Sequence, residues 1–386
     1  MGKFGCSLRM PGWFDTSNLT RGFAYGNIGG NDRLIVVSRD GGNNLFVLDA
    51  ATGDSLSVLD ASGITGGTYH ISDAAVSADG DIYVCNLALN TTLKVYKWDA
   101  VDASPSVVIE HPYTSGRVGD KMSAYGSSAD NSLTLLFGDA ANDQVLRFTT
   151  ADNGATFDPD TILIDQHGGS ASAALTDDGA LYHNASGVYL KRYDGGVSTQ
   201  VSGGVCGTGT NAIEFLFNDG KSEYAATFQY GGGNENARIL KVPDGDLTAA
   251  STYALTPTLG SNSNANGAGD VAVKDNGDGT YTVYVLSCNN GLGAYTFEFP
   301  VPPVDPVNMT NVMEVWGGDY GFFAASGDAS RGMGYNPVTD HILVASRAGG
   351  AYVHVLDAQT GAGARYAGYD RCYRWFLRYL SHESGC

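Results

Sequence analysis

The side chains that could do chemistry are spread thinly along this chain of 386 residues. The seven histidines stand apart, and none of them forms the HxH or HExxH spacing that places two imidazoles on one metal ion. No GxSxG nucleophile turn and no phosphate-binding glycine loop occurs in a strand-to-helix setting. The residues therefore contain no complete catalytic set, and we expect no catalytic residues and no cofactor.

The six cysteines form no CxxC pair. Three of them, Cys85, Cys206 and Cys288, stand in or beside predicted strands, whereas the others lie near the two ends of the chain. We interpret the three central residues as buried thiols, with one disulfide as the alternative and no metal site.

One acidic turn resembles a calcium loop. Asp275 and Asp278 lie three residues apart in the segment DNGDG, but an EF-type loop needs oxygen ligands at alternate positions and a glutamate at the twelfth. A hairpin turn explains the segment better, with a weak calcium site at these two residues as the alternative.

Composition restricts the fold and the partners. There are 53 glycines and only 11 prolines, which suits short strands joined by tight turns. The net charge of −19 disfavours nucleic acid and anionic membranes as partners, and no apolar run is long enough to span a bilayer. The first residues contain no apolar signal segment, so the chain is either cytosolic or, as we expect, an exported protein whose signal peptide is absent here.

Short apolar runs bounded by Gly, Asp and Asn recur along the chain and predict β-strands, with hairpin signals such as DDG and NDG between them. They group into units about fifty residues long, the length of a propeller blade. The predicted first strands begin near Arg21, Asp73, Met122, Ser170, Asn211, Asp270 and Arg331. We therefore expect an all-β fold, a β-propeller of about seven four-stranded blades, with six or eight as alternatives.

The closest internal match joins the two ends of the predicted ring. The segments at Arg33–Arg39 and His341–Arg347 are alike, and so are those at Leu45–Gly53 and Val353–Gly361; both pairs are offset by 308 (341 − 33 and 353 − 45). A radial array explains such a period, whereas a sandwich does not. If both copies belong to one ring, the first and seventh blades are neighbours.

The segment Val76–Val84 (VSADGDIYV) resembles blade phrases of NHL-type propellers. The aromatic pair Trp13 and Phe14, the strand Arg21–Tyr25 and the segment Gly63–Gly67 resemble more specifically a family of bacterial secreted propellers of unknown function. The resemblance covers the chain up to about Ala364. It implies export from the cell and gives no activity, so no functional residue is carried over.

Within a propeller, two groups of residues stand out. Thr150, Asp152, Gly154 and Phe157 match the Asp-box turn of sialidase-type propellers, a structural turn in which the carboxylate accepts backbone N–H groups. Charged residues at the starts of innermost strands should converge in the central channel, where propellers often bind ligands; these are Arg21, Asp73, Asp270 and Arg331. The alternative is that these charges only satisfy one another.

The composition changes at Arg365, where Arg, Tyr, Trp and Cys replace Gly, Ala and Asp. With a permitted codon choice, Asp370–Ser381 read one nucleotide over resembles Ser62–Ser72, again at an offset of 308 (370 − 62). We divide the chain into an N-terminal segment 1–20 that is a candidate ring-closing strand, a propeller 21–364, and a tail 365–386 that we interpret as a frameshifted repeat. An idiosyncratic native tail is the alternative.

Taken together, these features favour a non-catalytic extracellular or cell-surface propeller that binds a protein or a glycan, or that assembles with copies of itself. The alternative is a lactonase- or glycosidase-like hydrolase with a metal or an acidic site in the channel. Convergent carboxylates with a histidine around one cavity would favour the hydrolase, and balanced charges would favour binding.

Overall fold

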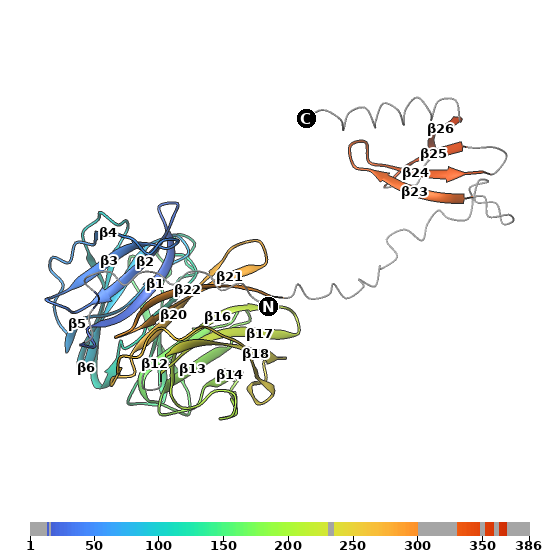
Figure 1. The fold of residues 1–386 in the computed structure, drawn as a ribbon. Coiled ribbons are helices and arrows are strands. Elements are labelled where there is room, and N and C mark those ends of the chain that lie inside the picture. Colours follow the sequence, from blue (N-terminus) through green and yellow to red (C-terminus); the bar gives the residue numbers. More distant parts are fainter. Residues whose placement is uncertain are drawn as a thin grey trace. The chain divides into compact units, whose positions relative to one another are not determined.

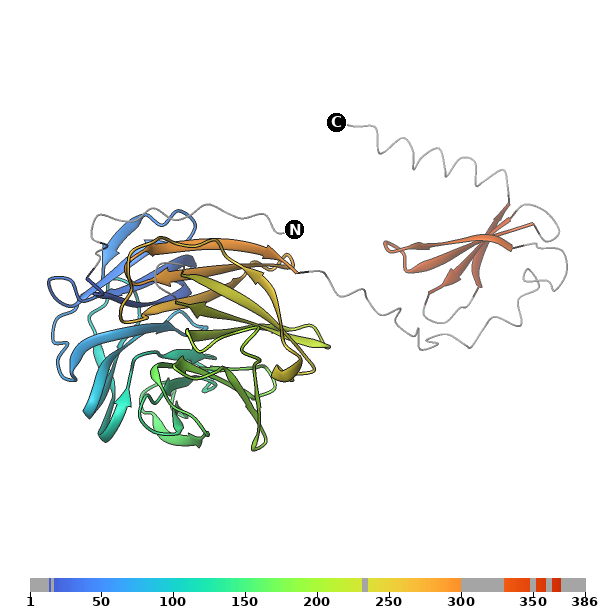
Figure 2. The ribbon, with the colours of Figure 1, turned by 60° about the horizontal axis from the view of Figure 1, so that its bottom comes forward.

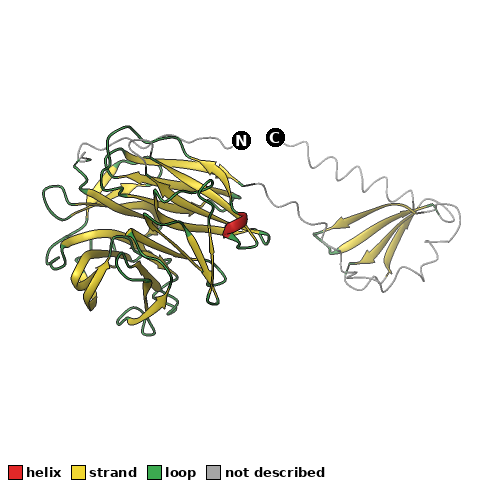
Figure 3. Ribbon diagram, turned by 90° about the horizontal axis from the view of Figure 1, so that it is seen from below, coloured by secondary structure: helices red, strands yellow, loops and turns green. Residues whose placement is uncertain are grey.

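The computed structural model describes residues 14, 17–230, 235–299, 330–347, 352–358 and 363–368. The described residues are all-β apart from one turn of 3-10 helix, η1 (Leu247–Ala249), as Figure 3 shows. The expected all-β fold is confirmed. Trp13, the connector around residues 300–306 and the tail from residue 369 lie outside the described residues.

The chain divides into two compact units, Met1–Pro302 and Pro303–Cys386. The propeller predicted over residues 21–364 therefore spans both. In the described residues the first unit holds six antiparallel sheets and the second unit holds one.

Each sheet is a meander, in which neighbouring strands follow one another along the chain. The first sheet consists of β1 (Thr20–Ile28), β2 (Asn31–Ser38), β3 (Asn44–Asp49) and β4 (Ser55–Val58). The second consists of β5 (Tyr69–Val76), β6 (Ile82–Trp98) and β7 (Ser106–Val118). The third consists of β8 (Ser123–Tyr125), β9 (Thr134–Gly138), β10 (Gln144–Thr149) and β11 (Asp158–Leu163).

The fourth sheet consists of β12 (Gly169–Leu175), β13 (Leu181–Ser186), β14 (Lys191–Asp194) and β15 (Val197–Gln200). The fifth consists of β16 (Thr210–Asn218), β17 (Ser222–Gln229), β18 (Asn236–Pro243) and β19 (Ser251–Leu255). The sixth consists of β20 (Gly269–Asp275), β21 (Thr280–Ser287) and β22 (Gly291–Glu298). The sheet of the second unit consists of β23 (Ser330–Asn336), β24 (His341–Ser346), β25 (Tyr352–Asp357) and β26 (Gly363–Gly368).

The first strands of the six sheets in the first unit follow one another around a common axis (Figures 1 and 2). β1 contacts β5, β5 contacts β8, β8 contacts β12, β12 contacts β16, and β16 contacts β20. β20 in turn contacts β1, so the first sheet has the second and the sixth as its neighbours. The expected count of seven blades, with the first beside the seventh, is not confirmed.

The hydrophobic core consists of six clusters, and each lies between two neighbouring sheets of the first unit. Between the sixth and first sheets, for example, Tyr284 and Leu286 pack with Phe23 and Leu34, and the described N-terminal residue Phe14 packs against them. Inner strands such as β2, β9 and β17 are buried on both faces in this way, whereas the outermost strands β4, β11 and β15 are largely exposed.

The sheet of the second unit repeats the first sheet in its pairing. β23 pairs with β24 through Ser330↔Ser346 and then Gly332↔Ala345, and β1 pairs with β2 through Thr20↔Ser38 and then Gly22↔Val37, each with an irregularity after the first pair. The partners on the second strands differ by 308 in both pairs (346 − 38 and 345 − 37). The internal repeat that the sequence predicts is therefore also a repeat in register.

Candidate functional site

The first strands carry polar side chains that bond to the backbone of a neighbouring first strand or the segment before it. Five such bonds tie the second sheet to the third, the third to the fourth, the fourth to the fifth, the fifth to the sixth, and the sixth to the first. They are Met122 N–H to Asp73, Ser123 Oγ to Ala173 O, Ile213 N–H to Ser172 Oγ, Asn211 Nδ2 to Gly267 O, and Phe23 N–H to Asp270. These bonds hold the walls of the channel in place, because each satisfies a buried backbone group of a neighbouring sheet.

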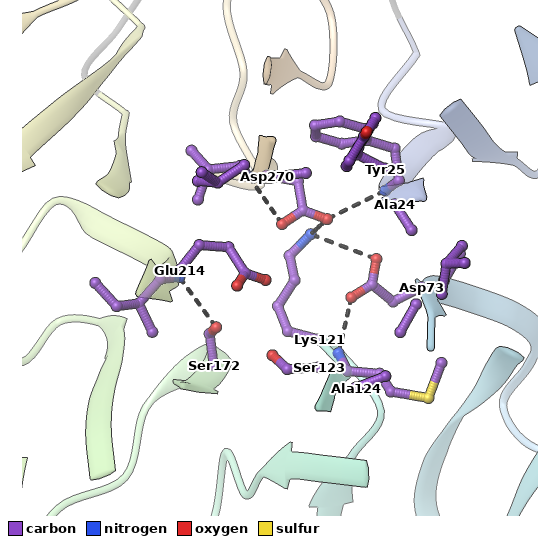
Figure 4. A pocket seen from close by; sticks show the side chains of 18 residues that line it. Ala24, Tyr25, Asp73, Lys121, Ser123, Ala124, Ser172, Glu214 and Asp270 are labelled. Atoms are coloured by element: carbon purple, nitrogen blue, oxygen red, sulfur yellow. Dashed lines mark hydrogen bonds and ion pairs between the residues drawn. The ribbon is translucent and has the colours of Figure 1, made fainter. Parts of the chain in front are cut away.

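The buried side chain of Lys121 lies between the carboxylates of Asp73 and Asp270 (Figure 4). The Lys121 ammonium lies 2.9 Å from Asp270 Oδ2 and 3.9 Å from Asp73 Oδ1, and it donates a hydrogen bond to the backbone oxygen of Arg21 at 3.1 Å. All three charged side chains are at most 8% exposed. Three sheets are therefore joined by one ion-paired group.

The pKa values follow from burial and from these neighbours. Burial raises the pKa of the Asp73 carboxyl well above its usual range, and the charge of Asp270 raises it further. Burial lowers the pKa of Lys121, but the charges of Asp270 and Asp73 outweigh it and hold the ammonium pKa above its ordinary value. The lysine therefore stays charged and is the counterion of both acids.

The ion-paired group needs a glycine opposite it. A Cβ at Gly22 would lie 1.7 Å from Asp73 Oδ1 and 3.2 Å from Asp270 Oδ2, so only the absence of a side chain leaves room for the two carboxylates. Gly332 occupies the same register position in β23, and no atom of the described residues lies within 4 Å of a Cβ built there.

On one side of the group lies a cavity of about 170 Å³, lined by residues that include Asp73, Lys121, Glu214 and Asp270. Figure 4 shows the three carboxylates pointing toward the side chain of Lys121. Burial and the charge of Asp270 raise the pKa of Glu214 to about 8. No histidine is among the residues that line this cavity.

The second recess has a volume of about 700 Å³ and is lined by residues at the starts of first strands, by the loops before them, and by residues of other strands such as Leu89 on β6 and Arg117 on β7. β1, β5 and β12 contribute Arg21, Tyr69 and Ser170, and Asn266 precedes β20. Because these four first strands belong to one ring, the recess lies at one mouth of the channel. We call it the arginine cup, after Arg21, Arg39 and Arg117 in its wall.

The three arginines differ in their partners. Arg117 donates two hydrogen bonds to the carboxylate of Asp120, at 2.7 and 2.6 Å. Arg39 donates from Nε to the backbone oxygen of Ile71 at 2.8 Å, and its guanidinium lies 4.1 Å from the centre of the Tyr69 ring. Arg21 donates to the backbone oxygen of Asn18 at 3.3 Å.

Of the four channel residues that the sequence predicts, Asp73 and Asp270 meet at Lys121, and Arg21 lines the cup. Arg331 lies on β23 in the second unit, and its side chain lies outside the described residues. Sequence reasoning missed Lys121 and Glu214. Lys121 directly precedes the predicted strand start at Met122, and this position could have identified it as a further charged residue of the channel.

The Asp-box-like segment is a turn stabilised by its own side chains. Asp152 accepts hydrogen bonds from the backbone N–H of Thr156 and from the hydroxyl of Thr150, and Thr150 Oγ1 accepts from the N–H of Gly154. Phe157 packs against the cluster between the second and third sheets, edge-on to Tyr83. The segment is remote from both cavities, whose lining includes none of these residues.

The weak calcium candidates also serve a turn: Asp275 accepts from the N–H of Gly277, and Asp278 accepts from the N–H of Thr280. In the described part of the chain no group of three or more His, Cys, Asp or Glu side chains could hold a metal ion.

Cys85, Cys206 and Cys288 are all buried. No helix among the described residues is long and apolar enough to cross a membrane.

Residues 14–179 match the family model described as a domain of unknown function, DUF4623. No curated protein matches the chain. Among solved structures, a DUF4623 family protein from Bacteroides eggerthii is 17% identical with a TM-score of 0.58, over 73% of this chain and 71% of that chain.

Two further solved structures are less similar. An aldose sugar dehydrogenase from Streptomyces coelicolor, in its PQQ-bound form, is 15% identical with a TM-score of 0.44, over 77% of this chain and 99% of that chain. The lectin of Aleuria aurantia, described as a six-bladed β-propeller, is 10% identical with a TM-score of 0.43, over 73% and 96%. At these identities the likeness concerns the fold alone. The resemblance to a β-propeller family of unknown function, which the sequence predicts, is thus confirmed, with the family match lying over residues 14–179.

Proposed function

We propose that this propeller is a non-catalytic binding protein and that its ligand, the end of a glycan, occupies the arginine cup. The observation that carries the proposal is the contrast between the two cavities. The cup has about 700 Å³, a size typical of ligand sites, and hydroxyl, amide and guanidinium groups line it. The inner cavity has about 170 Å³, and its charges are largely tied to one another through Lys121.

The hydrolase alternative depends on the inner cavity. Three carboxylates converge there, and a carboxyl with a pKa of about 8, that of Glu214, could act as a general acid. Against this role, the cavity is smaller than the pockets that hold substrates, and Lys121 occupies the space between Asp73 and Asp270. Binding is therefore the better-supported function.

A glycan array tests the proposal with one substitution that fills the cup. Thr68 lines the cup and is exposed, and its hydrogen bond to the described residues runs from its backbone N–H to the backbone oxygen of Leu87, so Thr68→Trp should block the site without unfolding the ring. Thr161→Trp on the exposed strand β11 is the matched control. We expect the wild type and the control to bind the same glycans and Thr68→Trp to lose them. Binding that survives Thr68→Trp, or no binding to any glycan, would contradict the proposal.

We also propose that six four- or three-stranded blades complete the ring and that β23–β26 is a copy of the first blade carried by the second unit. The cycle of contacts from β1 to β20 and back supports the count, as do the six core clusters. The shared register and the offset of 308 support the copy. Met333 in β23 is the equivalent of Phe23 in β1, because Met333 pairs with Val344 and Phe23 pairs with Val36. Met333 is 77% exposed, whereas Phe23 is 3% exposed. Export from the cell remains a prediction.

A further inference from the structure

The arginine cup is a cationic recess in a strongly acidic chain. The protein has 41 acidic and 22 basic side chains, yet the residues that line the cup include three arginines and neither aspartate nor glutamate. Charges of one sign gathered in a concave site raise the local concentration of ligands of the opposite sign.

Two of the three arginines have no acidic partner. Arg117 is neutralised by Asp120, at 2.6 Å, but the ion pairs of the described residues include neither Arg21 nor Arg39. The cup therefore carries two arginines that form no ion pair within the described part of the chain, although the charge of Asp120 also acts on Arg39.

One nitrogen of the Arg39 guanidinium lacks a hydrogen-bond partner among the described residues. Its Nε bonds to Ile71 O and its plane lies over Tyr69, whereas its Nη2 is buried and has no hydrogen-bond partner among the described residues. Burial, together with the charge of Arg21, lowers the pKa of Arg39 to about 10. Two like charges that line one recess repel each other, so the arrangement of Arg21 and Arg39 points to an anion bound between them.

The remaining lining includes Leu19, Leu87 and Leu89 as well as neutral polar residues, and the polar residues indicate which kind of anion fits. Thr68, Ser170, Ser186 and Asn266 place hydroxyl and amide groups in the same recess. Neutral donors and acceptors of this type suit a ligand with several hydroxyls, whereas an acidic peptide would present mainly carboxylates and backbone amides. The forked geometry of a guanidinium matches a carboxylate.

We infer that the ligand of the cup is a carboxylate-bearing saccharide, whose carboxylate binds Arg21 and Arg39 while its hydroxyls bond to the neutral side chains around them. This inference rests on the proposed function, because it requires the cup to be the ligand site. It adds the chemical class of the ligand, which the shape of the cup alone does not specify.

The test compares sugars that differ only in the acid. Isothermal titration of the full chain would use methyl glucuronide and methyl galacturonide, each against its neutral glycoside, together with N-acetylneuraminic acid and a hexaglutamate peptide. At least one acidic sugar should bind roughly tenfold or more tightly than its neutral counterpart, because one charge-assisted bidentate contact is lost in the neutral sugar. The affinity should fall as salt rises.

Substitutions assign the effect to the cup. Arg21→Gln and Arg39→Gln should each abolish the preference for the acidic sugar, and Arg147→Gln, which removes a partly exposed arginine on β10 paired with Asp160, should leave it unchanged. Among the described residues the Arg21 side chain bonds to Asn18 O alone, at 3.3 Å, so its variant keeps the test decisive if the Arg39 variant unfolds. Thermal melts of each variant identify a loss of fold.

The outcomes separate this inference from the proposed function. Equal affinity for acidic and neutral sugars, with both lost in Thr68→Trp, would show that the ligand needs no carboxylate, while the cup would remain the binding site. Binding of hexaglutamate and of no sugar would show that the ligand is not a saccharide. Failure of all these probes to bind would overturn the inference, and the glycan array would then decide separately whether the cup binds any glycan.

Discussion

Replacing the lysine that closes the channel should destabilise the ring in a pH-dependent way. Lys121→Met removes the only cation that touches Asp73 and Asp270 among the described residues, and it leaves two carboxylates at most 8% exposed without their counterion. Breaking a buried ion pair from one side costs about 3–5 kcal/mol of unfolding free energy. We expect a loss of this size near neutral pH.

The sign of the pH dependence follows from the carboxyls. The pKa of Asp73 is already raised in the folded protein, and removal of the ammonium raises it further. The folded variant therefore holds protons that the unfolded chain has released, and its stability falls as the pH rises above the ordinary carboxyl pKa. The difference between wild type and variant should thus be smaller at about pH 5 than at about pH 8.

Urea unfolding at both pH values measures this difference. Lys94→Met is the matched control, because Lys94 pairs at the surface with Glu110, which is 58% exposed, and such pairs contribute at most about 1 kcal/mol. A Lys121→Met variant that loses no more stability than the control, or whose loss is the same at both pH values, would refute the account of the channel.

Three further predictions follow from the same geometry. Gly22→Ala should lower the free energy of unfolding by about 1–3 kcal/mol, because its Cβ would lie 1.7 Å from Asp73 Oδ1. Gly332→Ala should lower it far less, because no described atom lies within 4 Å of a Cβ there. Chemical denaturation compares the two variants, and equal losses would contradict the close packing at Gly22. The wild type should lose stability relative to Glu214→Gln as the pH rises from about 4.5 toward 8, because the raised pKa of the carboxyl makes its ionisation in the folded protein unfavourable across that range. Melting temperatures of the two proteins, measured across this range, test the prediction. A constant difference between them would contradict the raised pKa. Removal of residues 303–386 should leave the main melting transition of the first unit unchanged, since the six core clusters lie within that unit; a large drop in its melting temperature would show that the second unit contributes to the ring.

Local patterns predicted the strands well because each blade is a short meander with strong turn signals. The expected strand starts at Asp73, Ser170, Asn211 and Asp270 all lie inside β5, β12, β16 and β20, and Met122 directly precedes β8. The prediction that Asp73 and Asp270 lie close together agrees with their positions beside Lys121, although Asp73 is in the middle of β5 and not at its start.

Closure of the ring and the composition of the cup depend on contacts that no local pattern encodes. The hydrogen bond from Phe23 N–H to Asp270 joins residues 247 positions apart. The sheet β23–β26 has the same strand order as the first sheet, so no local pattern in the sequence indicates the contact between β20 and β1. Arg39 follows the end of β2 and Arg117 lies near the end of β7, so neither stands at a strand start. Their meeting with Arg21 depends on the packing of the first and second sheets.

A crystal structure of the protein with the tightest-binding acidic sugar from the titrations would show directly where the ligand binds. We expect the sugar in the arginine cup, with its carboxylate in contact with Arg21 and Arg39 and its hydroxyls near Thr68, Ser170 or Asn266. A sugar bound beside Glu214 in the inner cavity, or elsewhere on the ring with the cup empty, would contradict it.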